Sequence, residues 1–416
     1  EAALTGNPAT SLDGDWLDYR RAKIAGPEEL EGAIVRALRV VNGYDAVFRL
    51  GVSGRLGKDV TEEVAARLIA ARNAIQERLA ASGDASLVEQ FSPNRFNSSA
   101  TLGENLAFGV PTSERTSNDS ISRIPYVRSI LDAESLTEPL VRIGLRMVET
   151  VIEVFPSLRP GHPLFERYSF IGQAEVEELS AALGARARKG ETRRLPIEVR
   201  NRLIEYAFMY VEPRHRLDLV DDTLRARILR ARASFRKFLP GAYASRIEFY
   251  HPEKIISSAS VSDNLLFGKI AFGAANAHER VSGVLNEVIC EQQLESFVLN
   301  QGLAYEAGPG GRFLAPHLQM IIHLARSILR RPDVLIIDNA MAAFPGYEAD
   351  IIMRSIKSEM QGRTLVATFT EAPQKIPFDR IITFDGPRLV DDRSSAEAES
   401  EQAALNQLAE TMEARS

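Results

Sequence analysis

The stretch Arg331-Pro-Asp-Val-Leu-Ile-Ile-Asp338-Asn339 decides the fold class of the C-terminal part of the chain. A helical pattern ending in Ala325-Arg326-Ser327-Ile328-Leu329 precedes it, and four apolar residues then lead to a carboxylate. This run predicts a strand of a parallel sheet that is covered on both faces, with Asp338 at the carboxyl edge, where open α/β folds bind ligands. A carboxylate at that edge can hold Mg²⁺ through water. The alternative is a buried strand ending in a loop Asp that has no ligand.

The segments on either side fit a recognisable order. A glycine-rich loop, Gly302-Leu-Ala-Tyr-Glu-Ala-Gly-Pro-Gly-Gly-Arg-Phe-Leu, precedes the helix, while Gly362-Arg-Thr-Leu-Val-Ala-Thr-Phe-Thr370 predicts a second strand and Phe378 to Asp391 predicts a hairpin. From about Ser262 to Asp391 the chain resembles the second half of the ATP-binding domain of ABC transporters. The matched order is helical subdomain, signature helix, Walker B strand, D-loop, switch strand and closing hairpin. The resemblance implies an α/β, P-loop-NTPase-like half, with ATP and Mg²⁺ as cofactors and Asp338 as the Walker B residue.

Several positions depart from the family pattern. Asn339 replaces the Glu that polarises the attacking water, and an amide cannot accept that proton. Thr370 falls where the switch His is expected. The Leu-Ser-Gly-Gly-Gln signature, which binds phosphate through a hydroxyl and backbone amides, becomes Leu314-Ala315-Pro316-His317-Leu318. Because Pro316 lacks an N–H group, this degenerate signature predicts weak phosphate binding and slow or absent hydrolysis.

The segment Gly51-Val-Ser-Gly-Arg-Leu-Gly-Lys58-Asp59 comes near a Walker A loop. A phosphate cradle has four residues between its outer glycines and a Ser or Thr after the Lys, to meet Mg²⁺. Here five residues separate the glycines, and Asp59 would repel phosphate. We therefore expect no Walker A loop in the chain, and interpret the segment as a loop that precedes a helix.

An internal repeat supports this interpretation. Residues 88–109 and 247–268 align without a gap at an offset of 159, which is 268 − 109. Both end in an Asn-Leu-x-Phe-Gly pattern that resembles the ABC segment after the Q-loop, where the helical subdomain begins. The pattern predicts that Phe108 and Phe267 occupy equivalent buried sites.

A predicted helix precedes each copy, over 61–79 and 221–239. Both helices mirror 317–329, and each of the three carries an Ala-Arg pair, at Arg72, Arg232 and Arg326. Thr61 and Asp221, followed by acidic residues, are good N-cap residues. A carboxylate is unsuited to a phosphate site, so the first two helices are interpreted as helix starts without a ligand.

Composition bounds the remaining possibilities. With 416 residues the chain predicts two or three domains. The net charge of −6 argues against a nucleic-acid surface, and one Cys, Cys290, suggests a reducing compartment. No apolar run has the length of a membrane helix, and no signal peptide is visible. Because the chain opens at Glu1 without Met, we expect a fragment that a transmembrane domain and a Walker A strand precede.

The pattern predicts six segments. They are an N-terminal segment at 1–26, the first repeat at 27–109, a helical insert at 110–220, the second repeat at 221–268, the ABC-like half at 269–391 and an acidic tail at 392–416. The tail predicts a marginal helix or disorder. The insert carries a broad apolar face that predicts core, formed by Leu140, Ile143, Leu145, Met147, Val151, Ile152 and Val154.

Other candidates carry weaker signals. Gln90 lies near the position of the family's Q-loop glutamine, although the second copy has Phe249 there. His317 and His323 are six residues apart, a poor spacing for a shared metal. The basic cluster at 186–194 is either a solvated loop or a contact with anionic lipid headgroups.

The sequence therefore predicts a degenerate ATP-binding region of an ABC transporter that couples nucleotide binding to transport with weak or no hydrolysis. Whether the chain is an enzyme stays open. The resemblance implies a transmembrane domain as partner, dimerisation through nucleotide-binding domains and a location at the cytoplasmic face of the cell membrane. The alternative is a non-catalytic helical scaffold built on an inherited ABC fold, and a Walker A loop upstream of Glu1 would separate the two.

Overall fold

The computed structural model describes residues 17–112, 121–154, 195–370 and 378–394. The chain forms two compact units, one made of 1–47 with 306–416 and the other of 48–305. The basic cluster at 186–194, most of the predicted N-terminal segment and nearly all of the acidic tail lie outside the described residues. The six predicted segment boundaries stay predictions.

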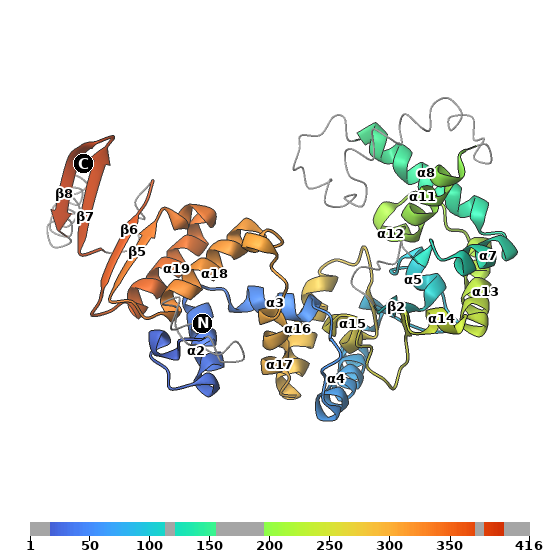
Figure 1. Ribbon diagram of the computed structural model, residues 1–416, viewed down its shortest axis with the longest axis horizontal. Helices are drawn as coiled ribbons and strands as arrows, with labels where there is room; N and C mark the ends of the chain where they lie inside the picture. Colours follow the sequence, from blue (N-terminus) through green and yellow to red (C-terminus); the bar gives the residue numbers. More distant parts are fainter. Residues whose placement is uncertain (1–16, 113–120, 155–194, 371–377, 395–416) are drawn as a thin grey trace, which may run out of the picture. The chain divides into compact units, whose positions relative to one another are not determined.

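The first unit packs helices against a small parallel sheet. Helix α2 (Pro27–Val40) contacts α18 (Pro316–Leu329) and α19 (Gly346–Glu359), and Figure 1 shows α18 and α19 beside β5 (Val334–Asp338) and β6 (Thr364–Thr368). Short 3₁₀ turns lie at Tyr19–Ala22, Pro309–Gly311 and Ala340–Ala343. Apolar residues at helical spacing fill the space between these elements, among them Leu38, Ile321, Leu324, Ile328, Ile352 and Ile356.

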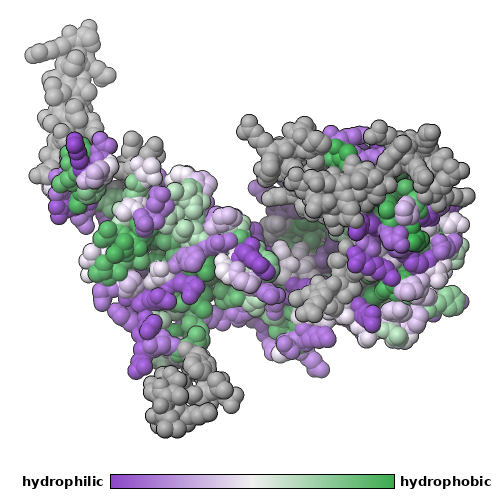
Figure 2. Space-filling model, turned by 45° about the horizontal axis from the view of Figure 1, so that its top comes forward, coloured by the Kyte–Doolittle hydropathy of each residue, from purple (hydrophilic) through white to green (hydrophobic). Residues whose placement is uncertain are grey.

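Strands β5 and β6 pair in parallel, with Ile336 opposite Val366 and Asp338 opposite Thr368. The predicted strand and its neighbour are thus confirmed, but the prediction that both faces are covered is wrong. Leu335 and Ile337 are buried, whereas Val334 is 55% and Ile336 is 68% exposed. In the described residues the helices cover one face of this pair, so the alternate side chains are left at the surface. Figure 2 shows hydrophobic surface on the part that carries these strands.

The predicted closing hairpin is also present. Strands β7 (Arg380–Asp385) and β8 (Arg388–Ser394) pair antiparallel, with a register shift between Thr383 and Phe384. Strand β8 runs three residues into the segment predicted as tail. An ion pair between Arg380 and Asp392 at 2.6 Å joins the two strands near their open end.

The second unit is mostly helical (Figure 1). Its first part contains α3 (Tyr44–Ser53), α4 (Glu62–Ala81), a 3₁₀ turn at Ala85–Leu87, β1 (Val88–Gln90), α5 (Leu102–Ala107) and β2 (Gly109–Pro111). Next come α7 (Pro125–Ala133), α8 (Thr137–Val154), α11 (Ile197–Phe208) and α12 (Glu212–His215). The last part contains α13 (Asp222–Phe238), α14 (Gly241–Ala244), β3 (Ile247–Phe249), α15 (Val261–Leu266), β4 (Gly268–Ile270), α16 (Ala277–Glu291) and α17 (Glu295–Leu303).

The two aligned segments lie against each other in this unit. Strand β1 pairs antiparallel with β4, and β2 pairs antiparallel with β3, so each segment contributes one strand to each pair. Helix α4 packs against α15 and α13 packs against α5. Phe108 and Phe267 are each 6% exposed and share one apolar cluster, which confirms that both rings are buried.

Capping and core predictions hold for the described helices. Thr61 Oγ1 accepts a hydrogen bond from Val64 N at 3.3 Å, and Asp221 Oδ1 accepts one from Leu224 N at 2.7 Å. The predicted apolar face of the insert lies in α8, where Leu140, Ile143, Leu145, Met147 and Val151 are buried. Ile152 packs against the same core and is partly buried.

Two buried arginines fix the segments to the helices. Arg72 Nε donates to Asn264 O at 2.8 Å and its other nitrogens donate to the carbonyl oxygens of His251, Pro252 and Lys254. Arg232 Nε donates to Asn105 O at 2.6 Å, and its Nη1 donates to the carbonyl oxygens of Ser92, Pro93 and Arg95. These acceptors correspond one to one at the offset of 159. Arg326 on α18 is exposed, so the third helix does not repeat this contact.

Candidate functional site

The carboxyl edge of β5 and β6 gathers polar side chains around Asp338. Because the strands pair in parallel, Asp338 and Thr368 end them side by side. Thr368 Oγ1 donates to Asp338 Oδ1 at 2.7 Å and accepts from the backbone N–H of Asn339 at 2.9 Å. Thr368 therefore fixes both the carboxylate and the start of the following turn.

Asn339 directs this turn. Its backbone lies in the left-handed region at φ 46°, a conformation that Asn tolerates better than most residues. The turn leads into the 3₁₀ segment Ala340–Ala343. Thr370 Oγ1 donates to Asn339 Oδ1 at 3.3 Å. Two positions that the sequence singled out as departures from the family pattern are thus in contact.

The donor set at this edge suits a hard cation. Asp338, Asn339, Thr368 and Thr370 offer carboxylate, amide and hydroxyl oxygens, which Mg²⁺ prefers, and Asp338 and Asn339 are exposed. Among the described residues no group of three His, Cys, Asp or Glu side chains could hold a metal. A single carboxylate fits a Mg²⁺ ion that takes its other ligands from water and phosphate oxygens. The residues present therefore fit the Mg²⁺ ion that the resemblance implies, with Asp338 supplying the negative charge.

The five positions predicted as a degenerate signature lie at the start of α18. Leu314 and Leu318 are buried, while Ala315, Pro316 and His317 are exposed. Pro316 is the first helical residue and has no N–H, and the N–H of Leu318 donates to Ala315 O at 2.9 Å. Of the first three helical residues, Pro316 has no N–H group and the N–H of Leu318 is already used in the helix turn. This helix start is a poor anion site compared with an amide-rich one.

Gln319 shapes the loop that precedes this helix. Its side-chain Nε2 donates to Gly311 O at 3.1 Å and to Leu314 O at 2.9 Å. Gly308, Gly310 and Gly311 adopt φ values of 72°, 65° and 78°, which suit glycine. The glycines therefore serve the geometry of the turn.

The glycine-rich segment at 51–59 is used for packing. Gly51 lies in the last turn of α3, and a Cβ at this position would lie 1.9 Å from Val298 O on α17. Leu56 N donates to Ala259 O and Gly57 N donates to Ser257 O, both at 2.9 Å. Amides engaged in this way cannot wrap a phosphate, and the absence of a Walker A loop stays a prediction. Lys58 is exposed beside them.

The remaining candidates are not brought together with Asp338. Gln90 ends β1 in the second unit, where it is exposed and pairs with Gly268. His317 and His323 are exposed on α18. Cys290 is an exposed free thiol on α16.

Sequence reasoning missed two sets of residues. Thr368 was not singled out, although a hydroxyl residue at the end of the second strand was a usable signal. The Ala-Arg pairs are visible in the sequence, but the pattern does not predict that Arg72 and Arg232 are buried and donate to backbone carbonyl oxygens. Burial lowers the pKa of Arg72 and of Arg232 to about 10, so both remain charged at neutral pH.

Comparison with known proteins gives relatives at low identity. The chain is 23% identical over 172 residues to a sophorolipid transporter of Starmerella bombicola, covering 41% of this chain and 13% of that protein. It is 27% identical over 130 residues to a putative export ATP-binding/permease protein of Rickettsia conorii, covering 31% and 21%. It is 27% identical over 139 residues to the heterocyst differentiation ATP-binding protein HepA of a Nostoc strain, covering 33% and 22%.

The chain spans less than a quarter of the length of these relatives. No protein-family profile matches it. No solved structure matches it either. In the part of the chain that the structure describes, no helix has both the length and the apolar character needed to cross a membrane. The sequence relationship of the chain is to ABC transporter and export ATP-binding proteins.

Proposed function

We propose that this chain is a region of an ABC-transporter ATP-binding protein in which Asp338 holds Mg²⁺-nucleotide weakly and hydrolysis is slow or absent. The observation that carries the proposal is the edge of β5 and β6, where Asp338, Thr368, Asn339 and Thr370 form one hydrogen-bonded group. The curated relatives, which include export ATP-binding/permease proteins, support the family relationship.

Each residue has a defined part in this proposal. When bound, Mg²⁺ would neutralise phosphate oxygens and hold them at the strand edge. Asp338 would bind the ion through water, and Thr368 keeps the carboxylate oriented by its 2.7 Å hydrogen bond. Asn339 can orient a water molecule but cannot take its proton. Thr370 holds the amide of Asn339, so the pair would position water without activating it.

The proposed weak affinity for nucleotide follows from the segments that could have bound phosphate, because backbone amides there are missing or already engaged. The N-terminus of α18 has Pro316 at its first position, and the amides of Leu56 and Gly57 are engaged with backbone carbonyls. The proposal therefore includes two partners. A second nucleotide-binding domain would supply phosphate ligands, and a transmembrane domain of an ABC transporter would supply the membrane part. The exposed apolar residues of β5 and β6 support the presence of a further layer in the assembled protein. Such an assembly would lie at the cytoplasmic face of a membrane.

The site is testable on the chain itself. Mn²⁺ replaces Mg²⁺ at oxygen sites and broadens nearby NMR signals, so it reports weak binding. With millimolar Mn²⁺-ATP, the amide signals of Asn339 and Thr368 should broaden. Asp338→Asn should abolish the effect, whereas Asp333→Asn, an exposed carboxylate at the start of the same strand, should keep it. Equal broadening in wild type and Asp338→Asn would refute a nucleotide role for Asp338.

A second candidate is the non-catalytic helical scaffold. The size of the helical second unit, with its two paired segments, favours it. We infer that in this case the first unit would show no response to Mn²⁺-ATP, while the helical unit would retain its fold and its binding to protein partners. Silence in the NMR experiment for both aspartate variants and wild type therefore selects the scaffold.

A further inference from the structure

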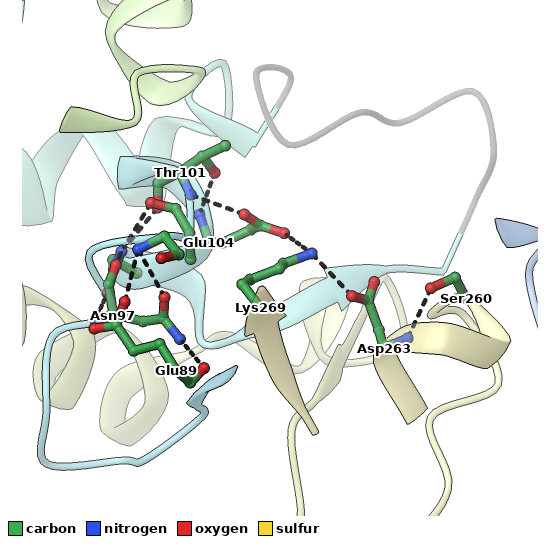
Figure 3. Close-up of polar contacts among 10 residues, drawn as sticks. Glu89, Asn97, Thr101, Glu104, Ser260, Asp263 and Lys269 are labelled. Atoms are coloured by element: carbon green, nitrogen blue, oxygen red, sulfur yellow. Dashed lines mark hydrogen bonds and ion pairs between the residues drawn. The ribbon is translucent and has the colours of Figure 1, made fainter. Parts of the chain in front are cut away.

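Two carboxylates occupy matching places in the paired segments of the second unit. Glu104 lies in α5 and Asp263 lies in α15, and the offset between them is 159, which is 263 − 104. Lys269 on β4 reaches both, with its Nζ 3.1 Å from Glu104 Oε1 and 3.0 Å from Asp263 Oδ1 (Figure 3). The three side chains are between 13% and 24% exposed. One ammonium group therefore bridges two largely buried carboxylates from different segments.

The surrounding contacts are related by an approximate two-fold axis. Phe91 N donates to Phe267 O at 2.9 Å, and the matching Tyr250 N donates to Phe108 O at 3.1 Å. The rings of Phe91 and Tyr250 stack with their centroids 4.0 Å apart. The ammonium breaks this symmetry, because the position that matches Lys269 in the first segment is 110, which is 269 − 159, and Val110 stands there.

We propose that Lys269 holds the pairing of the first segment, 88–109, with the second, 247–268, by neutralising Glu104 and Asp263 together. With Val110 at the position that matches Lys269, the first segment supplies no cation for Glu104. The pairing of unlike segments supplies one lysine for two carboxylates. Like charges left together in a largely buried site are strongly unfavourable.

The charged and titratable groups that face Lys269 agree with this role. Burial lowers its pKa, but Glu104 and Asp263 outweigh that effect and raise the pKa above its ordinary value, so the ammonium persists through neutral and alkaline pH. Burial, then Glu104 and Asp263, raise the pKa of Tyr250. Glu89, opposite Lys269 in the strand pair, binds the backbone N–H groups of Ser98 and Ser99. The Phe91 ring lies 5.9 Å from Lys269 Nζ.

The experiment compares variants of the full chain by hydrogen exchange of the amides that join the segments, at Phe91, Tyr250 and Ala271. Lys269→Met should raise their exchange rates at least tenfold at pH 8. Without the ammonium, the carboxylates repel, and proton uptake by one of them relieves the repulsion. The folded variant then binds more protons than the unfolded chain, so its defect should shrink as the pH falls from 8 to 5. Lys237→Met, at an exposed lysine, is the charge-matched control.

Two further variants test the charge itself. Val110→Lys in the Lys269→Met background moves the ammonium across the approximate two-fold axis, and should restore slow exchange. Glu104→Gln with Asp263→Asn and Lys269→Met removes all three charges and should restore folding even where Lys269→Met alone fails to fold. Wild-type exchange in Lys269→Met would overturn the proposal. So would a defect that neither rescue variant reduces, because repulsion between the two carboxylates would then not be its cause.

Discussion

Thr370 Oγ1 lies 3.3 Å from Asn339 Oδ1, so the two positions at which the sequence resemblance predicts a catalytic Glu and a switch His contact each other. A carboxylate and an imidazole at these positions could exchange a proton with water, whereas an amide and a hydroxyl cannot do so at neutral pH. We therefore expect this contact to hold the edge in place without acid–base chemistry.

The hydroxyl of Thr368 should matter to this edge. Thr368→Val keeps the shape of the side chain but removes the bonds to Asp338 and Asn339, so we expect a loss of about 1 kcal/mol in the free energy of unfolding. Urea denaturation followed by circular dichroism measures it. Thr364→Val, at the exposed other end of the same strand, is the matched control and should change stability little. Equal effects of the two substitutions would show that the Thr368 hydroxyl has no special role.

The buried arginines predict a larger and more selective effect. Arg72→Met or Arg232→Met leaves several buried or partly buried carbonyl oxygens without their charged donor, and each variant should cost about 3 kcal/mol. Arg326→Met, at the matching but exposed place on α18, should cost less than about 0.5 kcal/mol. Chemical denaturation of the three variants checks the ranking. A comparable cost for Arg326→Met would contradict the difference between the helices.

The aromatic pair tests the equivalence of the two segments. Phe108 and Phe267 have left-handed backbone conformations, with φ 47° and 44°, and the guanidinium groups of Arg232 and Arg72 lie 4.8 and 4.7 Å from their ring centroids. Truncation of either ring to Ala should cost about 3 to 5 kcal/mol. Denaturation midpoints give the two costs, and a difference of more than about 2 kcal/mol would show that the sites are not equivalent.

Substitution of Gly51 distinguishes a role in packing from a role in phosphate binding. Gly51→Ala would place a methyl group against Val298 O, so it should destabilise the fold by about 1 to 3 kcal/mol. Gly283→Ala, within α16 and with open space around it, should stabilise the fold by about 0.5 to 1 kcal/mol. Thermal unfolding of both variants decides the matter. A stable Gly51→Ala that lost affinity for ATP would restore the Walker A interpretation.

The sequence predicted the elements better than their partners. Strand β5, helix α18 and the N-caps at Thr61 and Asp221 follow from local patterns, and the structure contains them. The exposure of Ile336 could not be predicted, because an apolar run does not tell which face a neighbouring layer covers. The alignment of the segments likewise gave no sign that β1 pairs with β4, since strand pairing depends on the packing of distant residues.

The candidate site was predicted only in part, because strand pairing brings together residues that are distant in the sequence. Asp338 and Asn339 are adjacent in sequence, and the family order placed Thr370 near them. Thr368 acts only through the parallel register that sets it beside Asp338, and register is a property of two strands. Arg72 is buried and Arg326 is exposed. This difference depends on what each helix packs against, which the shared Ala-Arg pair does not indicate.

Steady-state ATP turnover by the purified protein tests the central claim most directly. Because several groups of one catalytic unit are replaced together, restoring one should recover little. The unmodified protein and Asn339→Glu should both turn over far more slowly than the enzyme median of about 10 per second. Turnover near that rate in the unmodified protein, abolished by Asp338→Asn, would contradict the account.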